Sequence, residues 1–115
     1  MVAPTGDPAY VPERGDVVWL QSGHEQAGHR PVVVVSPKAY NGRVRLALFC
    51  PISTNVKGYP FEVRLPEYGK TVGAILSDQI RSLDWRARRV RKFDQVPIEV
   101  MDAILMKIGA LVGRD

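Results

Sequence analysis

Residues 25–37 read EQAGHRPVVVVSP, and this stretch determines which fold the rest of the chain can build. A polar segment ends at Pro31, and four valines follow without a break at positions 32–35. A continuous β-branched run of this length predicts a short strand buried on both faces. The preceding residues 21–30 are polar and contain two glycines, so we expect a loop that emerges at the rim of the sheet.

Short apolar segments on either side of the valines predict four further strands. They lie at residues 17–20, 44–50, 61–65 and 73–76. Arg14-Gly15-Asp16 and Asn41-Gly42 predict turns, and residues 51–60 predict a second polar loop. Strands at such short spacing favour a small, strongly bent antiparallel sheet or a partial barrel.

The last twenty residues change to helical periodicity. Asp94, near Pro97, is expected to cap this helix, and Gly113 is expected to end it. Apolar side chains recur there at intervals of three and four residues, which is the spacing of one stripe along a helix. They are Met101, Ile104, Leu105, Ile108, Leu111 and Val112.

The length of 115 residues and mass of 12.8 kDa predict a single domain over residues 1–115. Residues 1–13 contain three prolines and are expected to form an extended leader. The longest apolar run, residues 46–50, is too short for a membrane helix, and no secretory signal is visible. The single cysteine, Cys50, lies in that run, which favours a buried thiol in a reducing cytoplasm.

Positive charge is concentrated in one segment of a chain whose net charge is +4. Residues 81–92 contain five arginines and one lysine against one acidic residue, Asp84. Arginine suits bidentate contact with phosphate, and the neighbouring Trp85 adds a flat aromatic ring, so this segment favours single-stranded nucleic acid. A solvated basic face without a partner, and a Trp85 that packs in the core, remain alternatives.

Nucleotide-binding glycine motifs and the α/β-hydrolase nucleophile motif are absent from the sequence. His24 and His29 lie five residues apart with Cys50 distant, so we expect no zinc site and no other metal. The two polar loops nevertheless combine a carboxylate, imidazoles, a guanidinium and hydroxyls, which suit phosphodiester cleavage without a metal. These side chains are His24, Glu25, Gln26, His29 and Arg30 in the first loop, and Ser53, Thr54, Asn55 and Lys57 in the second. A purely structural pairing of Arg30 with Glu25 is the alternative.

Several separate segments of the chain match segments of one protein family, and they follow one another in the same order. They are residues 14–16 (RGD), 25–37, 57–63 (KGYPFEV), 78–82 (DQIRS) and 85–88 (WRAR). Together they resemble the MazF/PemK toxins, the endoribonuclease halves of bacterial type II toxin–antitoxin pairs. The resemblance extends from about residue 11 to residue 113.

The resemblance implies a mainly β fold, an SH3-like barrel of the CcdB/MazF type with a C-terminal α-helix. It implies a cytoplasmic homodimer that cuts single-stranded RNA, including mRNA, at short motifs and thereby inhibits translation. Attack by the 2′-OH would leave a 2′,3′-cyclic phosphate and a 5′-OH, with no cofactor. The implied partner is a MazE-like antitoxin with an acidic disordered tail, and no membrane is involved.

The family's essential arginine falls on Arg30, its loop glutamate on Glu25, and its active-site threonine on Ser53, with Thr54 adjacent. Because arginine releases its proton only at very high pH, we interpret Arg30 as a clamp on the phosphoryl oxygens. Glu25 or His29 is then the candidate base, and His29 is the one with an ordinary pKa near neutrality. RNA binding is assigned to Lys57, Gln79, Trp85, Arg86 and Arg88.

Two rival functions fit the same barrel. Gyrase-poisoning toxins that resemble CcdB depend on a Trp-Gly-Ile ending, whereas this chain ends Val112-Gly113-Arg114-Asp115. A catalytically silent RNA-binding barrel would result if serine at position 53 disabled the site.

Overall fold

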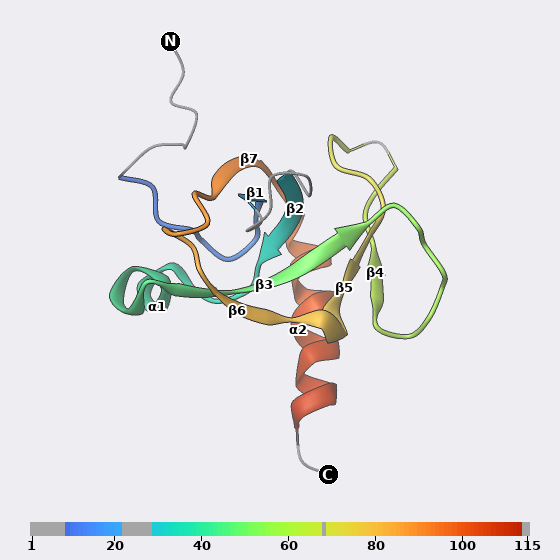
Figure 1. Ribbon diagram of the computed structural model, residues 1–115. Coiled ribbons are helices and arrows are strands. Elements are labelled where there is room, and N and C mark those ends of the chain that lie inside the picture. Colours follow the sequence, from blue (N-terminus) through green and yellow to red (C-terminus); the bar gives the residue numbers. More distant parts are fainter. Residues whose placement is uncertain (1–8, 22–28, 68, 114–115) are drawn as a thin grey trace.

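The computed structural model describes residues 9–21, 29–67 and 69–113, and these form an antiparallel sheet with a long C-terminal helix (Figure 1). The strands are β1 (Asp16–Gln21), β2 (His29–Val34), β3 (Leu46–Ser53), β4 (Glu62–Arg64), β5 (Ala74–Leu76), β6 (Arg81–Asp84) and β7 (Arg91–Gln95). The helices are α1 (Lys38–Val44), the short 3₁₀ helix η2 (Ser77–Gln79) and α2 (Ile98–Val112). The predicted antiparallel sheet and C-terminal helix are therefore confirmed.

Strand β3 is the centre of the sheet. The strand order is β4-β5-β3-β2-β1-β7, and β6 pairs with the first half of β3. Strands β6 and β7 are joined by a turn over residues 85–90, but no ladder connects them within the described residues. The sheet is thus strongly bent but open, and the expected closed barrel is not confirmed.

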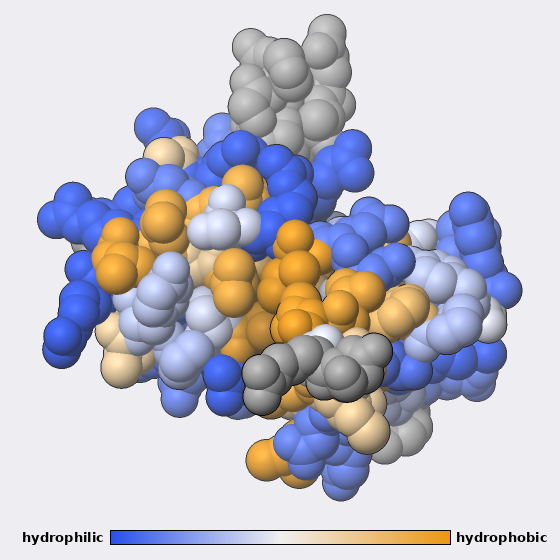
Figure 2. Space-filling view, turned by 90° about the horizontal axis from the view of Figure 1, so that it is seen from below, coloured by the Kyte–Doolittle hydropathy of each residue, from blue (hydrophilic) through white to orange (hydrophobic). Residues whose placement is uncertain are grey.

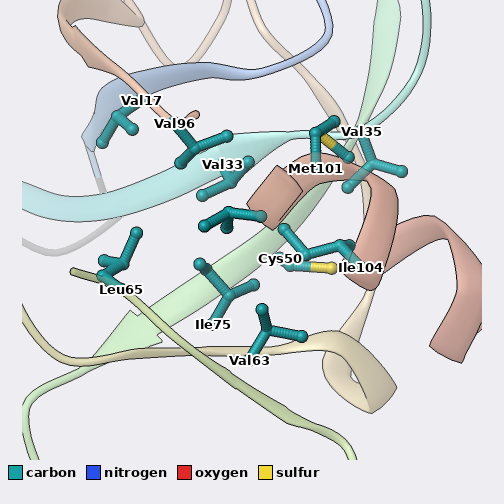
Figure 3. Packing of buried hydrophobic residues seen from close by; sticks show 11 residues of the cluster. Val17, Val33, Val35, Cys50, Val63, Leu65, Ile75, Val96, Met101 and Ile104 are labelled. Carbon is teal, nitrogen blue, oxygen red and sulfur yellow. The ribbon is translucent and has the colours of Figure 1, made fainter. Parts of the chain in front are cut away.

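The valine run lies in β2 and the residue after it, and it is buried on both faces, as predicted. Val33 and Val35 belong to one core cluster, the helix cluster, which includes Met101 and Ile104 of α2. Figure 3 shows these side chains packed between the sheet and α2. On the opposite face, a second set of buried residues surrounds Trp85, and we call it the Trp85 cluster: Val18, Leu20, Val32, Val34, Ala47, Phe49, Trp85 and Val90.

Helix α2 buries the first half of its apolar stripe, Val100, Met101 and Ile104. It ends at Gly113, as expected, but it begins after Pro97, and Asp94 is not its cap. Asp94 lies in β7, where its carboxylate accepts a hydrogen bond from Thr71 Oγ1 at 2.5 Å. The prediction for Asp94 was wrong because a strand continues to Gln95 and a partner distant in sequence binds the carboxylate.

The predicted turn at Asn41-Gly42 is also wrong, since both residues lie within α1. Asn41 is fully buried, and its Nδ2 donates to the carbonyl oxygens of Pro12 at 2.8 Å and Ser36 at 3.0 Å. Long-range hydrogen bonds therefore override the local turn preference of Asn-Gly. As a consequence the strand expected from residue 44 begins at Leu46, and it continues to Ser53 into the segment expected to be loop.

The end of the expected leader packs onto the domain, while residues 1–8 lie outside the described residues. Pro12 is fully buried, and Tyr10 donates its hydroxyl to Asp16 Oδ2 at 2.6 Å. Cys50 is buried as predicted, and this burial raises the pKa of its thiol to about 12. Within the described ranges, no helix has the length and hydropathy needed to cross a membrane.

Candidate active site

Arg30 of β2 and Ser53 of β3 lie at the same end of these two antiparallel strands. Val32 is opposite Pro51 and Val34 is opposite Phe49, in an antiparallel ladder. The ladder ends at Val32 and Pro51, and Ser53 pairs with Ala74 of β5. Arg30 and Ser53 each lie two residues beyond the end of the β2–β3 ladder. Because side chains alternate along a strand, both project from the face that carries the Trp85 cluster.

Strand β1 flanks the same position. Leu20 pairs with Arg30, and Gln21 pairs with His29 at the end of the β1–β2 ladder. The side chain of Arg30 is exposed, so the buried aliphatic row of β2 ends in a solvent-facing guanidinium. We call this end of the sheet the Arg30 rim.

The two candidate hydroxyls differ in their surroundings. Ser53 is half-buried at the end of β3, and its Oγ accepts a hydrogen bond from the Asn55 N–H at 3.1 Å. That contact uses an acceptor site and leaves the hydroxyl proton for donation. Thr54 is exposed and follows the last residue of the strand.

Gly73 packs against the backbone of the two residues that carry these hydroxyls. Its φ is +115°, and a Cβ at this position would lie 2.3 Å from the carbonyl oxygen of Ser53 and 3.3 Å from the Thr54 Cα. Only glycine permits this backbone contact, because both the conformation and the space exclude a side chain. Sequence reasoning missed this role, and its only signal was a glycine immediately before a short apolar strand.

Glu62 holds the second loop. It is 8% exposed, and its carboxylate accepts hydrogen bonds from the backbone N–H of Lys57 at 2.9 Å and of Gly58 at 2.6 Å. The loop is tied down further by Tyr59, whose hydroxyl donates to Asp78 Oδ1 at 2.8 Å. The backbone of Lys57 is therefore fixed while its side chain is exposed. The sequence analysis did not identify Glu62, because the alternating pattern of its strand predicted an exposed position.

The basic residues of positions 81–92 lie on two strands and a turn. Arg81 begins β6, and Arg86 and Arg89 are exposed in the turn that joins β6 to β7. Lys92 Nζ lies 3.1 Å from Asp16 Oδ1, a buried carboxylate, so a structural ion pair already uses part of the positive charge. Gln79 is exposed in η2, and Arg88 is half-buried.

Trp85 is a core residue. It is 7% exposed, and its Nε1 donates to the carbonyl oxygen of Asn41 at 3.0 Å. The ring fills the interior of the Trp85 cluster and has no free face on which a base could stack. We therefore correct the expected RNA-binding role of Trp85 in favour of the core-packing alternative.

The structure describes only some of the remaining catalytic candidates. The backbone of His29 begins β2 at the Arg30 rim, opposite Gln21. Glu25 and His24 lie outside the described residues. Among residues 9–21, 29–67 and 69–113, no group of three histidine, cysteine or acidic side chains is arranged to hold a metal ion.

Comparisons with known proteins show the family of the chain. Residues 13–112 match the family model described as "PemK-like, MazF-like toxin of type II toxin-antitoxin system". The chain is 44% identical over 108 residues to the endoribonuclease toxin MazF of Escherichia coli K12, covering 90% of this chain and 96% of that protein. It is 34% identical over 109 residues to the Escherichia coli endoribonuclease PemK, covering 87% of this chain and 81% of that protein.

A solved structure is similar to this chain in fold as well as in sequence. The MazE–MazF crystal structure (form II) from Deinococcus radiodurans contains a chain that superimposes with a TM-score of 0.84 at 43% identity. The match covers 92% of this chain and 99% of that one. Family model, sequence and fold coincide over nearly the same residues, and the chain belongs to the PemK-like, MazF-like toxins of type II toxin–antitoxin systems.

Proposed function

We propose that this protein is a toxin endoribonuclease that cuts single-stranded RNA at short sequence motifs in the cytoplasm and so inhibits translation. The observation that carries the proposal is that Arg30, which is exposed, and Ser53 lie at the same end of the antiparallel strands β2 and β3. A guanidinium and a hydroxyl at the same end of a sheet can together bind one phosphate. The similarity to endoribonucleases MazF and PemK supports RNA as the polymer that supplies it.

The proposed chemistry is an internal transesterification. The 2′-OH of the nucleotide attacks the adjacent phosphorus, the bond to the 5′-oxygen breaks, and the products carry a 2′,3′-cyclic phosphate and a 5′-OH. Arg30 stabilises the charge that develops on the phosphoryl oxygens, and Ser53 donates a hydrogen bond to one of them. Glu25 or His29 accepts the 2′-OH proton, the leaving 5′-oxygen takes a proton from solvent to become the 5′-OH, and no metal takes part.

Cleavage of a long RNA of mixed sequence in the presence of EDTA tests this function. Discrete fragments with 5′-OH ends are expected, and mapping them would reveal the cleaved motif. Binding without cleavage would instead indicate a silent RNA-binding barrel. The absence of both binding and cleavage would favour a toxin with a protein target.

The two hydroxyls are separated by a pair of alanine variants. We expect Ser53→Ala to reduce kcat substantially, by about tenfold or more, because one preorganised hydrogen bond to the phosphate is lost. Ser53→Thr should retain activity, and Thr54→Ala should be affected less, because Thr54 lies beyond the strand end. The opposite ranking, measured by single-turnover cleavage, would assign the role to Thr54.

The RNA path that we propose follows polar side chains that are exposed, or half-buried in the case of Arg88. Lys57 in the second loop, Gln79 in η2 and the turn residues Arg86 and Arg88 are the contacts that we assign to it. The tight anchoring of the second loop by Glu62 supports this assignment, because a fixed loop loses little entropy on binding.

The proposed protein partner is a MazE-like antitoxin with an acidic disordered tail, and the MazE–MazF complexes from Deinococcus radiodurans support it. A carboxylate-rich tail and RNA phosphates are both attracted to the basic residues of positions 81–92. We therefore expect an acidic tail peptide to displace labelled RNA from the toxin in a fluorescence anisotropy titration. Simultaneous binding without loss of RNA affinity would contradict a shared surface.

We also propose a homodimer. The end of the α2 stripe remains uncovered, with Leu111 45% and Val112 73% exposed, and Met106 is 70% exposed. Figure 2 shows a broad apolar area on the face seen from below, the side on which α2 ends in Figure 1. Burial of this area against a second copy explains why so much apolar surface is retained. A monomer in sedimentation at micromolar concentration would refute the dimer.

A further inference from the structure

The turn that joins β6 to β7 is held rigidly at both ends. Trp85 and Val90 are 7% and 6% exposed, and the Val90 N–H donates to the Trp85 carbonyl at 3.3 Å. Asp84 Oδ1 accepts from the backbone N–H groups of Arg86 and Ala87, each at 3.0 Å. The turn therefore presents its outer side chains from a fixed backbone.

Arg89 occupies an unfavourable backbone conformation in this turn. Its φ is +52°, and among the described residues only Arg45 shares a positive φ without being glycine. In this region the Cβ of an L-residue approaches the neighbouring carbonyl, so glycine is the residue that the backbone favours. The side chain of Arg89 is exposed and contributes no core packing that would offset the strain. The strain alone assigns no function, because Arg45 is also exposed and shares it, and the surroundings of the turn distinguish Arg89.

The position of the turn indicates a function for the Arg89 side chain. The backbone N–H of Gln21 donates to the carbonyl oxygen of Arg88 at 3.1 Å, which ties the turn to the end of β1. Gln21 pairs with His29, and its neighbour Leu20 pairs with Arg30. The turn that contains Arg89 is thus hydrogen-bonded, through Arg88, to the end of β1 that pairs with His29 and Arg30.

We propose that Arg89 is an RNA-contacting residue, and that its guanidinium binds a backbone phosphate close to the one held at the Arg30 rim. This inference rests on the proposed endoribonuclease function. RNA is favoured over an acidic peptide because the turn is hydrogen-bonded to the end of β1, which flanks Arg30. Consecutive phosphates along a single strand supply the spaced negative charges that Arg30 and Arg89 would bind.

The test compares Arg89→Gly with Arg45→Gly. Both variants remove one arginine from a left-handed position, so we expect each to unfold at the same temperature as the wild type or a few degrees higher. Arg45 immediately precedes β3, at the end of this strand opposite to Ser53, about 26 Å away at about 3.3 Å per residue. Arg45→Gly is therefore the matched control for both charge and backbone.

Binding is measured with a 2′-O-methyl RNA of mixed sequence, which cannot be cut by 2′-OH attack. Loss of one phosphate contact should lower the slope of log K against log salt concentration by about 0.7, or weaken binding about fivefold at 0.1 M salt. We expect this change in Arg89→Gly and not in Arg45→Gly. Arg89→Ala, which keeps the Cβ, should show the same binding loss without a higher unfolding temperature.

Three results would overturn the proposal. They are an unchanged salt slope in Arg89→Gly, an equal loss in Arg45→Gly, or weaker binding of an acidic peptide with RNA binding intact. A wild-type protein that neither binds nor cuts RNA would refute the proposed function itself. Wild-type cleavage combined with an unaffected Arg89→Gly variant would refute only the role of Arg89.

Discussion

Arg30→Ala is expected to cleave RNA about 10²- to 10³-fold more slowly than the wild type, because a preorganised charge at the phosphate is lost. The fold should persist, since the Arg30 side chain is exposed and lies outside both core clusters. Single-turnover rates and thermal unfolding, measured on the same preparation, separate the catalytic effect from the structural one.

Arg30→Lys should restore little of this activity. An ammonium group carries the charge but cannot form the planar, two-pronged contact of a guanidinium with phosphate. Arg43→Ala, at an exposed residue of α1, is the matched control and should retain the wild-type rate. If Arg30→Ala keeps more than about a tenth of the wild-type rate, then Arg30 is not the phosphate clamp.

The valine run predicted β2 correctly because its signal is local. Four β-branched residues in succession favour extended backbone and exclude solvent on both faces, whatever lies elsewhere in the chain. The stripe of α2 was equally local, and its end at Gly113 was predicted as well. Asn41-Gly42 failed for the opposite reason, since Asn41 reaches Pro12, 29 positions away, and this contact outweighs the turn preference.

Strands β6 and β7 were not predicted, because their sequences are dominated by charge. Arg81 through Asp84 form a ladder only against the apolar first half of β3, so the strand exists through its partner. Trp85 illustrates the same dependence. Its place beside arginines suggested an exposed stacking platform, whereas the bend of the sheet buries it against Phe49 and Val34.

The candidate site likewise contains some residues that the sequence can identify and others that it cannot. Arg30 and Ser53 could be identified in the sequence, since residue type and family resemblance identify reactive groups. The residues that fix the neighbouring backbone could not, because Gly73 acts on the backbone of Ser53 and Glu62 on that of the second loop. Backbone contacts leave no chemical signature in the sequence, and only the register of the strands reveals them.

An RNA with a single deoxyribose immediately 5′ of the scissile bond is expected to bind with nearly unchanged affinity and not to be cut at all. The 2′-OH is the proposed nucleophile, and removing it deletes the attacking atom while leaving every phosphate available to Arg30. The same oligonucleotide with the deoxyribose one position further along is the control, and it should be cut at close to the normal rate. EDTA should change neither result, because the charge on the phosphoryl oxygens is stabilised by the guanidinium.

Cleavage of the first oligonucleotide, or a requirement for magnesium, would show that water rather than the RNA itself supplies the attacking oxygen. Arg30 would then be a binding residue in a hydrolytic site, and the general base would have to act on water instead of on the 2′-OH.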